Sequence, residues 1–141
     1  MTEPFPSPGV IPTLPAPRVG EKVIIPVKGL PPYKDLSFSI RNPNHPSYAS
    51  FVELRNEAIK VMGGRTWYDG AVQLNLTLNA PSLDRNLSDY VGGIEETLDG
   101  SHGMTFTYLP IVFQDDCQVS SIEAKFVKSD ETGYIIEIEF A

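Results

Sequence analysis

The chain has 141 residues, 41% of them hydrophobic and 10% aromatic, which fits one globular domain with one continuous core. Its 18 acidic and 11 basic residues give a net charge of −7, a poor balance for proteins that gain nucleic-acid affinity from Lys and Arg. No apolar run is long enough to span a membrane, and a single cysteine, Cys117, excludes an internal disulfide and a zinc cluster of the usual kind.

The chain begins with a segment rich in proline. Nine of the 13 prolines lie within the first 32 residues. Because proline fixes φ and removes a hydrogen-bond donor, residues 2–18 are predicted to form an extended, polyproline-like arm, with a tail of no fixed structure as the alternative. The start also lacks the basic residues and apolar run of a signal peptide, so we expect a cytoplasmic protein. These features divide the chain into a proline-rich arm, residues 1–20, and a domain, residues 21–141.

A strand and a helix are predicted next. Residues 23–27 have the composition of a strand, and Pro26 favours a place at the edge of a sheet. The stretch "PSYASFVELRNEAIKVMGG" has apolar residues at three- and four-residue spacing, which is typical of a helix packed on a core. Ser47 is its expected N-cap, and Gly63 and Gly64 are expected to end it.

The second half predicts a strand, a short helix and two more strands. "GAVQLNLTLNAP" alternates apolar and polar residues, as a strand with one buried face does. "SDYVGGIEETLDG" predicts a short helix with Ser88 as its N-cap. "QVSSIEAKFVKS" and "GYIIEIEFA" predict strands joined by the turn "SDETG". The order β-α-β-α-β-β indicates an α+β fold, a small mixed sheet with two helices on one face and a final antiparallel hairpin.

Carboxylates gather in two segments that could meet at one end of this sheet. Asp84 and Asp89 lie around the start of the second helix, and Asp115 and Asp116 precede the third strand. If the flanking strands are neighbours, these groups would open at the same end and could hold Mg²⁺, which takes oxygen ligands. A metal held there could polarise a phosphodiester and generate hydroxide.

Each of these residues also has a purely structural interpretation. Asp89 is expected in the first turn of a helix, where the helix dipole favours a negative charge. The Asp115–Asp116 pair is typical of a turn, and Glu95 and Glu96 are predicted to form a solvated helix face. Cys117 follows two aspartates, which should raise its pKa and weaken it as a nucleophile.

Two segments resemble the RusA family of Holliday-junction resolvases. "NLSDYVGGIEETLDG" is similar to the family's helix, which is entered through Asp-Leu-Asp-Asn-Leu with a Lys three residues after the Asn. "FQDDCQVSSIEAKFV" is similar to its Asp-Asp-x-Gln-Val segment and strand. "VIIPVKGLPPYK" and "GAVQLNLTLNAP" resemble its first strand with a Pro-Pro turn and its central strand. The resemblance, over residues 23–140, implies a Mg²⁺-dependent endodeoxyribonuclease of DNA recombination and repair.

The family's site residues carry over only in part. Asp116 matches the second Asp of the Asp-Asp pair, a metal ligand in the family. Asn86 and Ser88 stand where the family has its two helix-entry aspartates. Asp89 stands at the Asn position and Gly92 at the Lys. The resemblance therefore implies a catalytic group of Asp116, Asp89, Asp84 and Asn86, in which Asp116, Asp89 and Asp84 would share Mg²⁺.

Two hypotheses follow from this partial match. The first is a RusA-like nuclease with a relocated acidic cluster, and the second is a RusA-fold binding or structural module without nuclease activity. A homodimer is expected under the first, because RusA-like proteins meet two-fold junctions, and the proline arm could order itself on a partner. Neutral residues at the metal positions and a charge of −7 disfavour branched DNA, so we expect weak or absent cleavage.

Overall fold

A computed structural model describes residues 11–34, 43–99 and 109–141 of the chain. Within these ranges the order is β1 (Lys22–Lys28), α1 (Tyr48–Met62), β2 (Val72–Ala80), α2 (Leu87–Leu98), a short 3-10 helix η1 (Asp116–Gln118), β3 (Val119–Lys128) and β4 (Gly133–Phe140). The predicted α+β class and the β-α-β-α-β-β order are therefore confirmed for the described residues.

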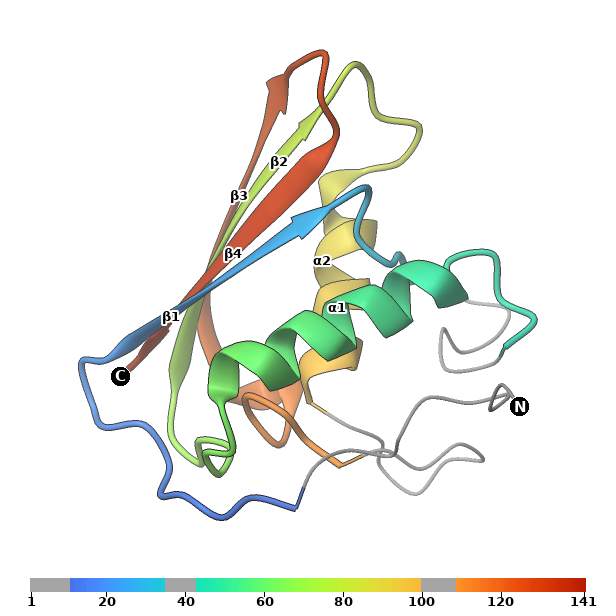
Figure 1. Ribbon diagram of the computed structural model, residues 1–141. Helices are drawn as coiled ribbons and strands as arrows, with labels where there is room; N and C mark the ends of the chain where they lie inside the picture. The colour runs from blue at the N-terminus through green and yellow to red at the C-terminus, as the bar shows by residue number, and fades with distance from the viewer. Residues whose placement is uncertain (1–10, 35–42, 100–108) are drawn as a thin grey trace.

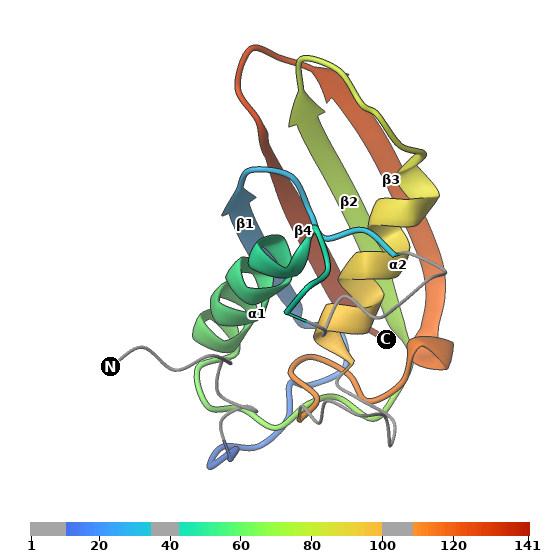
Figure 2. The same ribbon diagram turned by 90° about the vertical axis from the view of Figure 1, so that its right-hand side faces the viewer.

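The protein has two layers, a twisted sheet and a pair of helices that cover one of its faces (Figures 1 and 2). The helices bury the inner face because alternate residues of β1, β2 and β4 are apolar and point inward, whereas Ile24 and Ile135 are exposed on the other face. The buried strand residues are Val23, Ile25 and Val27 of β1, Val72, Leu74, Leu76 and Leu78 of β2, and Tyr134, Ile136, Ile138 and Phe140 of β4.

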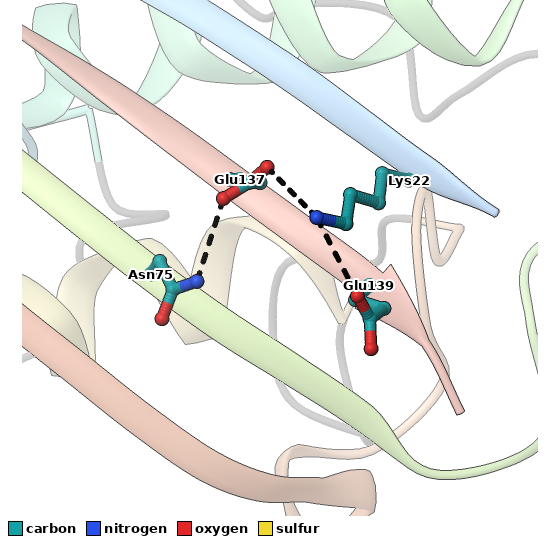
Figure 3. Close-up of polar contacts among 4 residues, drawn as sticks. All are labelled: Lys22, Asn75, Glu137 and Glu139. Atoms are coloured by element: carbon teal, nitrogen blue, oxygen red, sulfur yellow. Dashed lines mark hydrogen bonds and ion pairs between the residues drawn. The ribbon is translucent and has the colours of Figure 1, made fainter. Parts of the chain in front are cut away.

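The other face of the sheet is polar and carries its own ion pairs (Figure 3). The Lys22 ammonium lies 3.6 Å from a carboxylate oxygen of Glu137 and 3.6 Å from one of Glu139. The Asn75 side chain donates to the other oxygen of Glu137 at 3.4 Å. These residues come from β1, β2 and β4, so the polar side of the alternation ties three strands together.

The strands lie in the order β1-β4-β2-β3, so the predicted final hairpin is wrong. β4 pairs antiparallel with both β1 and β2, and β3 pairs parallel with β2. Burial explains why β4 rather than β3 takes the central position, because the inward residues of β4 are all buried, whereas those of β3 are half-buried or exposed. The four residues between Lys128 and Gly133 reach about 13 Å, enough to cross the roughly 9.6 Å of two strand spacings.

The described part of the N-terminal arm packs on its own chain. Thr13 and Leu14 each donate a backbone N–H to the Gly64 carbonyl at 3.0 Å, and Thr66 donates its N–H to the Leu14 carbonyl at 3.0 Å. Gly20 then donates to the Phe140 carbonyl at 2.6 Å, which leads the chain into β1 beside the end of β4. The rest of the predicted arm, residues 1–10, lies outside the described residues.

α1 begins and ends where the sequence predicts. Ser47 is the N-cap and Gly63 closes the helix in the left-handed conformation, with φ of 60°. The Ser47 hydroxyl makes no cap hydrogen bond and instead accepts the Tyr33 N–H at 3.3 Å. This contact ties the Pro-Pro turn after β1 to the start of α1.

α2 begins two residues earlier than its predicted N-cap would allow. Asn86 occupies the cap position with an extended backbone, so the predicted cap, Ser88, is wrong and lies within the first turn. The Asp89 N–H donates to the Asn86 carbonyl at 3.1 Å, which starts the helix. Gly93 lets the Pro-Pro turn approach the helix, because a Cβ at this position would lie 2.8 Å from the Tyr33 nitrogen.

Candidate functional site at the acidic edge of α2 and η1

The Asp-Asp-Cys-Gln segment forms a tightly hydrogen-bonded turn before β3. Asp115 Oδ1 accepts the Cys117 N–H at 2.9 Å, and Gln118 Oε1 accepts the Asp115 N–H at 2.9 Å, so the two residues cap η1 reciprocally. The Gln118 amide also donates to the Tyr68 and Gly70 carbonyls at 2.8 Å each. Asp115 and Gln118 therefore hold the turn, and Asp116 is left exposed between them.

Asp116 is electrostatically coupled to Glu95 on α2. Burial and then the negative charge of Asp116 raise the pKa of Glu95 to about 6, from its usual 4.5. Lys34 opposes this rise and Glu96 adds to it. The prediction that Glu95 and Glu96 form a solvated face is wrong, since both are only partly exposed and belong to this charge cluster. We call Glu95, Asp116, Lys34 and Glu96 the acidic edge.

Lys34 reaches the acidic edge by crossing α2 at Gly92. Its Nζ lies 3.7 Å from Glu96 Oε1, and a Cβ built at Gly92 would lie 3.1 Å from Lys34 Cδ and 3.2 Å from its Cβ. The Lys34 N–H donates to the Asp89 carbonyl at 3.0 Å, which fixes the backbone beside the helix. Gly92 stands where the resembled family has a lysine, and the side chain of Lys34, from the Pro-Pro turn, covers this position.

The other predicted site residues lie around the start of α2. Asn86 is the N-cap, and Asp89 lies in the first turn, as its structural interpretation predicted. Asp84 and Asp89 raise the pKa of Tyr90, after burial as the largest cause, whereas Arg85 lowers it. Glu95 stands six positions after Asp89, about 9 Å further along the helix axis.

The predicted three-carboxylate site does not form in the part of the chain that the structure describes. Among residues 11–34, 43–99 and 109–141, no three His, Cys, Asp or Glu side chains gather as a group that could hold a metal ion. Asp116 instead interacts electrostatically with Glu95, so two carboxylates come together rather than three. Glu95 and Lys34 were not among the predicted site residues, and the Lys in "PPYK" was the available signal for the second.

Cys117 has the character that the sequence predicts. A hydrogen bond with Asp115, followed by desolvation and the charges of Asp115 and Asp116, raises the pKa of this exposed thiol. A thiol with a raised pKa carries little thiolate near neutral pH. The acidic edge therefore offers carboxylates and an ammonium for chemistry, and no activated thiolate.

No protein-family model matches the chain, and no curated protein matches it at a significant level. Within the described residues, none of the helices combines the length and apolar character that crossing a membrane requires.

The raised pKa of Glu95 predicts a pH-dependent stability. The folded state binds this proton more tightly than the unfolded state, so Glu95 favours folding below about pH 4.5 and the benefit is lost as the pH rises toward 6. We expect Glu95→Gln to stabilise the protein at pH 7.5 by about 1 kcal/mol, after allowance for solvent screening, and to have little effect at pH 4. Urea unfolding at the two pH values measures the difference. An equal effect at both would contradict the coupling.

Proposed function

We propose that the protein is a RusA-like, Mg²⁺-dependent endonuclease of low activity, acting on branched DNA in recombination and repair. The observation that carries this proposal is the coupling of Glu95 and Asp116 at one edge of the sheet. Asp116 is the residue that matches a metal ligand of the family, and Glu95 supplies the second carboxylate that the helix-entry positions lack.

Two carboxylates are enough for the metal that this chemistry needs. Mg²⁺ is commonly bound by one or two carboxylates together with waters and substrate phosphates. Asp116 and Glu95 would hold the ion, and the elevated pKa of Glu95 means that binding below about pH 6 would displace its proton. When bound, Mg²⁺ supplies polarisation of the phosphorus and a hydroxide nucleophile.

Lys34 supports the same proposal from within the acidic edge. Its side chain is 52% exposed beside Glu96, so its ammonium can exchange that partner for a phosphate oxygen. A cation at this place would stabilise negative charge that develops on the phosphate. Lys34 would therefore take the role of the lysine that Gly92 replaces.

The low activity follows from what the edge lacks. Asn86 and Ser88 bring neutral oxygens to the two helix-entry positions, and Asp84 and Asp89 surround Tyr90 at the start of α2. A net charge of −7 also repels DNA phosphates, and added salt weakens this repulsion. These same features favour the second candidate, a RusA-fold binding or structural module without nuclease activity.

Cleavage of a synthetic four-way junction separates the two candidates. With Mg²⁺ or Mn²⁺ we expect slow cleavage of the junction, no cleavage after addition of EDTA, and little cleavage of a linear duplex of the same sequence. Absence of junction cleavage with either metal, at protein concentrations well above that of the DNA, would reject the nuclease and favour the binding module.

A further inference from the structure

β3 is an edge strand with one unpaired side. Among the described residues it pairs only with β2, and it runs for 10 residues, Val119–Lys128, without a proline. The opposite edge strand, β1, has Pro26 at its centre, which removes a donor and discourages further pairing. An unprotected edge presents a row of free N–H and C=O groups that can pair with another strand.

Several side chains of β3 are also exposed or lack an ion-pair partner. Ile122 is 46% exposed although it lies on the face that the helices cover, and Val127 is 43% exposed. Glu123 and Lys125 are both exposed, and in the described parts of the chain neither makes an ion pair. The charges on β1 and β4 differ in this respect, because Lys22, Glu137 and Glu139 neutralise one another (Figure 3).

We propose that two copies of this chain form a dimer by antiparallel pairing of their β3 strands about a two-fold axis at Ala124. A two-fold axis perpendicular to the sheet keeps the helix-covered faces of both copies on the same side. Opposed residues must then point to the same face, so the axis must pass through a residue rather than between two. Each possible centre fixes every opposed pair.

Charge favours Ala124 over the centres on either side of it. An axis at Glu123 would oppose Glu123 to its own copy, and an axis at Lys125 would oppose two lysines, and like charges placed directly opposite are destabilising. An axis at Ala124 opposes Glu123 of each copy to Lys125 of the other. The two opposite-charge pairs that result lie on the polar face of the sheet.

The same register also matches the apolar residues of the inner face. Ile122, Ala124 and Phe126 lie opposite Leu74, Leu76 and Leu78 of β2, so they share the face that the helices cover. With the axis at Ala124, Ile122 of each copy opposes Phe126 of the other, and directly opposed side chains lie about 4.5–5.5 Å apart. The dimer would therefore cover the exposed Ile122 and join two four-stranded sheets into one.

Charge reversal tests the interface and its register together. We expect the wild-type protein to sediment as a dimer at micromolar concentration. Glu123→Lys opposes lysines at both pairs, and Lys125→Glu opposes glutamates, so each variant should dimerise at least about tenfold more weakly, or about 1.4 kcal/mol. An equimolar mixture of the two variants should recover a dimer, because each heterodimer regains two opposite-charge pairs.

Glu131→Lys is the matched variant, since it makes the same charge change in the exposed turn after β3 and should leave dimerisation unchanged. A monomeric wild type would overturn the proposal, as would a dimer that tolerates both reversals. Single variants that weaken and a mixture that does not recover would reject the Ala124 register. These outcomes do not depend on nuclease activity, so the dimer and the proposed function can fail separately.

Discussion

Replacement of Gly93 by alanine is expected to lower the free energy of unfolding by about 1–3 kcal/mol, whereas alanine at the neighbouring Gly92 should be neutral or stabilising. The two glycines are adjacent on α2 and differ in what a Cβ would meet. At Gly93 the new carbon would collide with the Pro32 carbonyl oxygen and lie 2.5 Å from its carbon. Backbone atoms in a turn held by both helices cannot move aside as a side chain can.

At Gly92 the obstacle is the flexible side chain of Lys34. A Cβ there would lie 3.1 Å from Lys34 Cδ, a contact that a small rotation of the lysine relieves. Alanine also has a helix propensity about 1 kcal/mol better than that of glycine, which offsets the remaining strain.

Urea unfolding of the wild type and both variants at neutral pH measures the contrast. Gly92→Ala is the matched control, because it makes the same chemical change one residue away on the same helix. Similar stabilities for the two variants would show that the close packing of the Pro-Pro turn on α2 is wrong. A destabilised Gly93→Ala would instead support the placement of Lys34, which follows directly on that turn.

Local patterns in the sequence predicted the elements well. The alternation in "VQLNLTLNA" gave β2 its buried face, and Ser47 and Gly63 marked the ends of α1. Pro26 correctly placed β1 at an edge, because the missing N–H excludes a central position. These features depend on neighbours within a few residues, which is why a single sequence is enough to predict them.

Features that depend on distant parts of the chain were not predicted. β4 lies between β1 and β2 rather than beside β3, because its apolar residues gain more from a central position than those of β3. Alternation shows which face of a strand is buried but does not show which strands pair with it. The predicted N-cap of α2, Ser88, was also wrong, because Asn86 lies two positions earlier and Asn caps a helix as well as Ser does.

The candidate site shows the same division. The local hydrogen bonds of the Asp-Asp-Cys-Gln turn leave Asp116 exposed, and its role could be proposed from the motif alone. Glu95 and Lys34 come from α2 and the Pro-Pro turn, far from Asp116 in sequence. Matching positions one by one against a family pattern considers only the matched positions, so it does not consider side chains that approach from other elements.

The largest effect is expected for Asp116→Asn, which should reduce metal-dependent cleavage of a four-way junction by about a hundred- to a thousand-fold. The substitution keeps the size of the side chain and removes the charge that would hold the metal. Loss of one well-placed electrostatic group in an active site costs about 3–4 kcal/mol of transition-state stabilisation, which corresponds to this range. Asp115 and Gln118 hold the turn independently of Asp116, so the fold should be retained.

Glu95→Gln should cause a loss of similar size if the two carboxylates act as one metal site. Glu131→Gln removes the same charge from an exposed turn and should leave the rate unchanged, which separates the site from the effect of net charge on DNA binding. Single-turnover rates on a labelled junction, with Mg²⁺ and then Mn²⁺, give the comparison. If the wild type cleaves the junction, cleavage by Asp116→Asn at the same rate would show that the acidic edge is not the catalytic site.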